Sequence, residues 1–152
     1  MSNFLTDGRL GLMAALQGDA GIDAKVKTYF DFGPGLRRRP ALEPALCPAL
    51  SLAPAETSQE RVANLEREVP HLLRIEVATA GQDVQPCEEL AALVVDRVNA
   101  CNEDCLGLAA DGLTGLRVRS VHWAALPDEQ AARIIWTASV EVELLWRLAE
   151  TA

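Results

Sequence analysis

The clearest pattern in the chain is an alternation of apolar and polar residues over 133–146. The apolar positions are Ile134, Trp136, Ala138, Val140, Val142, Leu144 and Trp146, and the polar ones include Thr137, Ser139, Glu141 and Glu143. Because successive side chains of a strand point to opposite faces, this alternation predicts a strand with one buried face. With 117–125 and a polar turn at 127–130, it predicts a long antiparallel hairpin. At about 3.3 Å per residue the last strand would run roughly 45 Å, so we expect part of it to meet another subunit.

Two further segments have clear periodicity. Val69, His71, Leu73, Ile75 and Val77 share one parity and Arg74 and Glu76 take the other, which predicts a half-buried strand reaching Thr79. Residues 86–101 begin with a proline, continue with two glutamates, and place an apolar stripe at helical spacing. That stripe is Leu90, Leu93, Val94, Val98 and Cys101. The second segment therefore predicts an amphipathic helix.

The first third of the chain is patterned less strongly. Residues 6–17 predict a helix with Thr6 or Asp7 as its N-cap, and 25–32 predict a short strand. Residues 49–53 lie between Pro48 and Pro54 and predict a strand near a sheet edge, followed by a polar connection over 56–64. The intervening segment, 33–47, has three prolines and two glycines and predicts a long loop.

This order of elements predicts an α+β fold. We expect a mixed or antiparallel sheet with two main helices packed on it and a long C-terminal hairpin, because the strands cluster without regular βαβ alternation. A chain of 152 residues is the size of a single domain, so one domain over 1–152 is expected.

Composition narrows the functional classes. A formal net charge of −8 and a pI near 4.7 disfavour adhesion to nucleic acid or to an anionic membrane. The sequence has no apolar run of membrane-spanning length and no secretion signal, so we expect a protein kept in the cytosol. Cys47, Cys87, Cys101 and Cys105 are then expected to be free thiols, with oxidised pairing a minor alternative.

The sequence gives only weak support for a catalytic site or a metal site. Cys101 and Cys105 with His71 or His122 could imitate a zinc site, but the second tight ligand pair of a closed site is missing. A cysteine paired with either histidine could act as a nucleophile, yet no local signature surrounds any thiol. Buried apolar thiols, such as Cys87 and Cys101, are the favoured interpretation. We therefore predict no cofactor, no metal and no enzymatic activity.

The remaining polar motifs favour surface contacts. The glutamate pairs 66/68 and 141/143 alternate as solvated strand faces do, and the glycine pairs 8/11 and 33/35 lack the spacing and lysine of a phosphate-binding loop. Arg37, Arg38 and Arg39 form the one basic cluster, which suits a solvated loop, an acidic partner surface or, less well, DNA. We take these arginines, with Glu141 and Glu143, as candidate subunit or partner contacts.

The series of elements resembles a known family. A Pro-Ala-Leu strand at 48–50, an Ile-Glu-Val strand at 75–77, the helix from Glu88 and the polar-alternating last strand are similar to the minor tail and tail terminator proteins of long-tailed bacteriophages. The resemblance implies an α/β subunit assembled as a hexameric ring at the head-proximal end of the virion tail. Such a ring stops tail tube polymerisation and provides the surface for head-tail joining.

The resemblance also implies partners. They would be other copies of the chain, the tail tube protein and a head-completion or connector protein, with assembly in the host cytoplasm. Six copies would carry a formal charge of about −48, through which DNA could pass without specific binding. The alternatives are another neck or tail tube subunit, or a cytosolic dimeric α+β binding domain.

Overall fold

The computed structural model describes residues 3–31, 44–57, 60–63, 66–101, 105–128 and 133–149. The helices are α1 (Phe4–Gln17), α2 (Ala20–Lys25) and α3 (Gln85–Ala100), with short 3₁₀ turns η1 (Pro44–Leu46) and η2 (Ala109–Asp111). The strands are β1 (Thr28–Asp31), β2 (Ala49–Thr57), β3 (Glu60–Ala63), β4 (Glu66–Gly81), β5 (Leu113–Asp128) and β6 (Arg133–Ala149).

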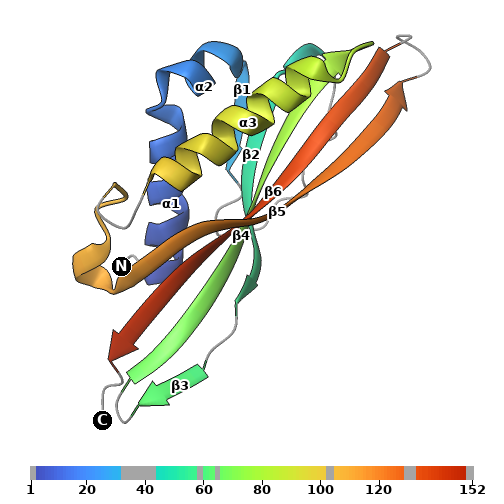
Figure 1. The fold of residues 1–152 in the computed structure, drawn as a ribbon. Helices are drawn as coiled ribbons and strands as arrows, with labels where there is room; N and C mark the ends of the chain where they lie inside the picture. Colours follow the sequence, from blue (N-terminus) through green and yellow to red (C-terminus); the bar gives the residue numbers. More distant parts are fainter. Residues whose placement is uncertain are drawn as a thin grey trace.

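The strands form one mixed sheet in the order β1-β2-β4-β6-β5, with β3 beside the start of β4. Only β1 and β2 run parallel; the other pairs are antiparallel. The helices cover one face of this sheet, and the ends of β4 and β6 extend beyond them (Figure 1). The predicted α+β fold with a long C-terminal hairpin is therefore confirmed.

The buried face of the sheet follows the predicted parity. Every residue of the set Val69, His71, Leu73, Ile75 and Val77 is buried, and so are Ala138, Val140, Val142, Leu144 and Trp146 on the neighbouring strand β6. The side chains of α1, α2 and α3 that point at the sheet join them in one apolar cluster. Burial of this cluster drives the helices onto the sheet, since removal of apolar surface from water is the main favourable term in folding.

Helix α1 packs unusually close to β6. A Cβ atom placed on Gly8 would lie 2.8 Å from Leu144 Cδ2 and 2.9 Å from Trp146 Cζ2. The ring of Phe4 meets the indole of Trp146 edge-on, with the ring centroids 5.3 Å apart. Only glycine allows this approach, so Gly8 is a packing residue and not part of a phosphate-binding motif.

The N-terminal boundaries differ from the prediction. Helix α1 begins at Phe4 because Asn3 is its N-cap, and the Asn3 side chain accepts a hydrogen bond from the Thr6 amide at 2.9 Å. Thr6 and Asp7 lie inside the first turn. Helix α2 was not predicted; Asp19 caps it by accepting from the amide of Ile22, which is fully buried.

The strand predicted at 49–53 does lie near a sheet edge, with only the four-residue β1 outside it, but its predicted end at Ala53 is wrong. β2 lies between β1 and β4 and continues to Thr57, past Pro54. Pairing with β1 ends at Leu52, so Pro54 has an open side where a missing donor costs little. The predicted polar connection 56–64 is also wrong in part, because β3 forms a strand there.

The C-terminal hairpin is longer than predicted. β5 starts at Leu113 and β6 continues to Ala149. Pro127 and Asp128, assigned to the turn, pair with Ile134 and Arg133, so they belong to β5. Residues 129–132 lie outside the described part of the chain.

The prediction that all four cysteines are free thiols is wrong. Cys101 and Cys105 form a disulfide, with their Cα atoms 5.3 Å apart. Cys101 is the extended C-cap residue of α3. Cys47 and Cys87 are not part of a disulfide.

Candidate functional site

The sheet face opposite the helices is the candidate site, and we call it the open face. It carries the second parity of β4 and β6, together with the matching residues of β5. Its polar members include Glu68, Arg74, Glu76, Thr137, Ser139, Glu141, Glu143, Arg147, Arg117, Arg119, Ser120 and His122. None of α1, α2 and α3 covers this face (Figure 1), and at one end of it Phe30 and Cys47 pack on the buried residues Ala49, Ala78 and Ile135.

Glu143 is the most buried acid on the open face. It is 8% exposed, and it accepts from Arg117 Nε at 3.0 Å and from Arg119 Nη1 at 3.3 Å. Arg117 and Arg119 both reach it because the register of β5 shifts between Val118 and Ser120. The bulge thus gives one carboxylate two cationic partners.

Glu141 forms the neighbouring polar group. Its carboxylate lies 3.7 Å from Arg74 Nη2 and accepts a hydrogen bond from the Ser120 hydroxyl at 3.2 Å. The same hydroxyl lies 3.2 Å from His122 Nε2. The polar residues of β4, β6 and β5 are therefore joined across three strands.

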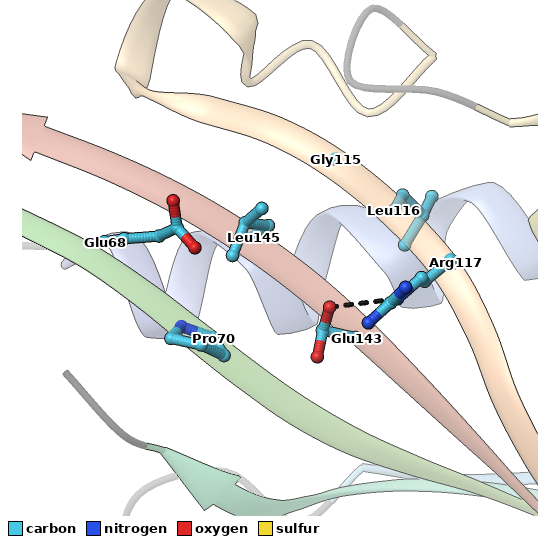
Figure 2. A pocket seen from close by; sticks show the side chains of 7 residues that line it. All are labelled: Glu68, Pro70, Gly115, Leu116, Arg117, Glu143 and Leu145. Carbon is cyan, nitrogen blue, oxygen red and sulfur yellow. Dashed lines mark hydrogen bonds and ion pairs between the residues drawn. The ribbon is translucent and has the colours of Figure 1, made fainter. Parts of the chain in front are cut away.

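A shallow hollow lies beside this network and encloses about 450 Å³. It is lined by Glu68, Pro70, Gly115, Leu116, Arg117, Glu143 and Leu145, shown in Figure 2. Gly115 opens the space because it has no side chain over Leu145. Pro70 and Leu145 give the hollow an apolar part, and the Arg117–Glu143 ion pair lies at its side (Figure 2).

The ion pair itself should contribute little to stability. We expect a double-mutant cycle of Arg117→Ala and Glu143→Ala to give a coupling energy below about 1 kcal/mol, because Arg117 is 66% exposed and water screens the attraction. Urea denaturation of the four proteins measures it. A coupling above about 2 kcal/mol would show that the pair stabilises the fold and is not primarily a surface feature.

Of the five predicted contact residues, two lie in the described part of the chain. Glu141 and Glu143 lie together on the open face, but their carboxylates already pair within the subunit. Arg37, Arg38 and Arg39 lie outside the described residues. The contact role of all five residues stays a prediction.

The residues weighed for metal or nucleophilic chemistry are not brought together. Cys101 and Cys105 are joined to each other, His71 is buried under the helices, and His122 is exposed on the open face. Burial raises the pKa of the Cys87 thiol, which disfavours the thiolate. Within the described ranges, no three His, Cys, Asp or Glu side chains are grouped to hold a metal ion.

Sequence reasoning missed a second hollow, at the hairpin end of the sheet on its helix-bearing face. It encloses about 440 Å³ and is lined by Val84, Glu88, Trp123, Ala124, Ala125 and Trp136. We call it the tryptophan hollow. The indole of Trp136 donates to the Gly81 carbonyl at 3.3 Å. A tryptophan in the uncharged stretch 121–127 was the available signal in the sequence.

Comparison with known proteins identifies the fold. No protein-family model matches the chain, and no curated protein matches it. A solved structure does: a chain in the virion of a native gene transfer agent particle, at 18% identity and a TM-score of 0.57. The match covers 94% of this chain and 99% of that chain. Separately, no helix in the described residues is long and apolar enough to cross a membrane.

Proposed function

We propose that this protein is a structural subunit of a phage-like virion and, more specifically, a tail terminator. In this role a hexameric ring occupies the head-proximal end of the tail tube, stops its polymerisation and provides the surface for head-tail joining. The role is structural and needs no cofactor. Its partners would be other copies of the chain, the tail tube protein and a head-completion or connector protein.

The observation that carries the virion assignment is the fold. The similar gene transfer agent chain is a virion component, and the two chains match over nearly their whole lengths. A fold alone does not determine function, so the terminator role rests in addition on the sequence resemblance to tail terminator proteins. The disulfide between Cys101 and Cys105 also fits a released particle, because disulfides persist on virions outside the reducing cytoplasm.

The shape and charge of the subunit suit a ring. Its sheet has two unlike faces, one covered by helices and one open, and a terminator needs unlike surfaces toward the tube and the head (Figure 1). The net charge of −8 lets DNA pass through the ring without being trapped. We assign Glu141 and Glu143 to a subunit contact and Arg37, Arg38 and Arg39 to an acidic partner surface.

Electron microscopy of particles made without this protein tests the proposal. We expect tails of uncontrolled length that are not joined to heads, because nothing would block the growing end of the tube. Supplying the wild-type protein from a plasmid is the control and should restore uniform tails and infectivity.

Each rival function gives a different result. Absence of all tails would indicate a tube subunit, and tails of normal length beside leaking heads would indicate a head-completion protein. Normal, infectious virions would contradict any virion role and leave the cytosolic binding domain.

A further inference from the structure

The outer half of β5 near the hairpin turn is an unpaired sheet edge. The sheet order ends at β5, which pairs in the described chain with β6 alone. Along Val121–Leu126, which we call the open edge, the backbone groups on the outer side have no described strand beside them. Such a row of donors and acceptors is a template for another strand.

The first half of β5 has features that prevent pairing with another strand, and the open edge lacks them. From Leu113 to Ser120 the strand has two register shifts and carries Arg117 and Arg119. Bulges and charges are the usual means by which proteins prevent edge-to-edge pairing. The open edge has no charged residue and no register shift. The contrast within one strand indicates that pairing is prevented at one end and permitted at the other.

The open edge also carries an exposed apolar side chain on each face of the sheet. Residues 122–126 are all exposed, and Trp123 and Leu126 keep 53% and 50% of their surface. They lie on opposite sheet faces, since Trp123 is paired with Ala138 and Leu126 with Ile135. An added strand would therefore meet apolar side chains on each face as well as free backbone groups.

The tryptophan hollow lies directly beside the open edge. Trp123 and Trp136 form its apolar wall, and Trp136 is held by its hydrogen bond to Gly81. Glu88, at the first turn of α3, supplies its one acidic side chain. Buried tryptophans near the centre of an interface often carry much of the binding energy. A side chain from an added strand could fill this hollow.

We propose that the open edge binds an extended segment of another polypeptide, with apolar residues at alternate positions and a basic residue near Glu88. The segment would add a strand to β5 and place an apolar side chain in the tryptophan hollow. The opposite edge of a second copy fits less well, because β1 has only four residues and the stretch of β2 beyond it contains Pro54 and a register shift. This docking site goes beyond the terminator role and does not depend on it.

A fluorescently labelled peptide of alternating Thr and Val, with one Val replaced by Lys so that Lys and Val share a face, tests the proposal by binding to the purified full chain. Fluorescence anisotropy should show saturable binding, and hydrogen exchange should show new protection of the amides of residues 121–126. Trp123→Ala should weaken binding about tenfold, as expected for loss of a central aromatic contact. Leu10→Ala, which truncates an exposed leucine on α1, is the matched control and should have no effect.

Two further comparisons make the test specific. The same peptide with N-methylated backbone should lose binding, because it keeps its charge and side chains but cannot donate to the strand edge. Glu88→Gln should weaken binding, whereas Glu56→Gln, at an exposed position of β2, should not. Equal binding of the methylated peptide, or no binding at all, would overturn the proposal. Protection of 121–126 that rises with protein concentration without peptide would overturn it in favour of a second copy.

Discussion

Replacement of Trp146 by alanine is expected to lower the free energy of unfolding by about 3–5 kcal/mol. Trp146 is fully buried between α1 and the sheet, where Phe4 and Gly8 pack against its ring. The close approach of α1 leaves little freedom for the helix to collapse into the space, so a cavity should remain. Urea denaturation followed by far-ultraviolet circular dichroism measures the loss.

Trp123→Ala is the matched control for this experiment. Trp123 is 53% exposed on the edge strand, so its truncation should change stability by less than about 1 kcal/mol. Similar losses from the two variants would contradict the assignment of Trp146 to the core and Trp123 to a surface site.

Residue parity predicted the faces of the sheet well but not their coverage. The sequence places Trp136 and Trp146 on one face of the last strand, and the structure agrees. Only Trp146 is fully buried, because α1 covers it, whereas Trp136 lies near Val84, just before α3 begins. Alternation along a strand shows to which sheet face each side chain points. Which of these side chains a helix covers depends on how elements distant in the sequence pack.

Short elements and long-range pairings were beyond the sequence pattern. Helix α2 has six residues and one fully buried side chain, which is too little for a periodic signal beside two glycines. The Cys101–Cys105 disulfide was not predicted, because the cellular compartment of a protein gives no information on the distance between two cysteines. In the structure the Cα atoms of these two cysteines lie 5.3 Å apart, which allows the sulfur atoms to bond.

The candidate site was predictable only in part. Glu141 and Glu143 could be placed on the polar face by counting, but their partners could not. Arg119 reaches Glu143 because of a register shift in β5, which moves an arginine by one position and has no signature in the sequence. The open edge likewise depends on strand order, which local patterns do not fix.

Acid is expected to destabilise the protein through His71. This side chain is buried under the helices between Thr57 and Leu144 of the flanking strands, and its Nδ1 atom has no hydrogen-bond partner in the described structure. Burial lowers the pKa of His71 from 6.5 to about 4, because the charged imidazolium loses its hydration. Between about pH 4 and pH 6.5 the unfolded chain therefore binds a proton at His71 that the folded protein does not bind.

The sign of the effect follows from this difference in proton binding. Stability from a neutral His71 is fully present above pH 6.5 and falls as the pH drops toward 4, by about 2 kcal/mol at pH 5 and about 3 kcal/mol at pH 4. Carboxylates also titrate in this range, so the comparison is between wild type and His71→Leu, whose urea midpoints should depend less on pH by that amount. His122→Ala, which removes the exposed histidine of the open face, is the matched control and should retain the wild-type dependence. Parallel pH profiles for wild type and His71→Leu would mean that the folded protein accommodates a charged imidazole at this position, and that the core beneath α1 is more hydrated than the packing around His71 indicates.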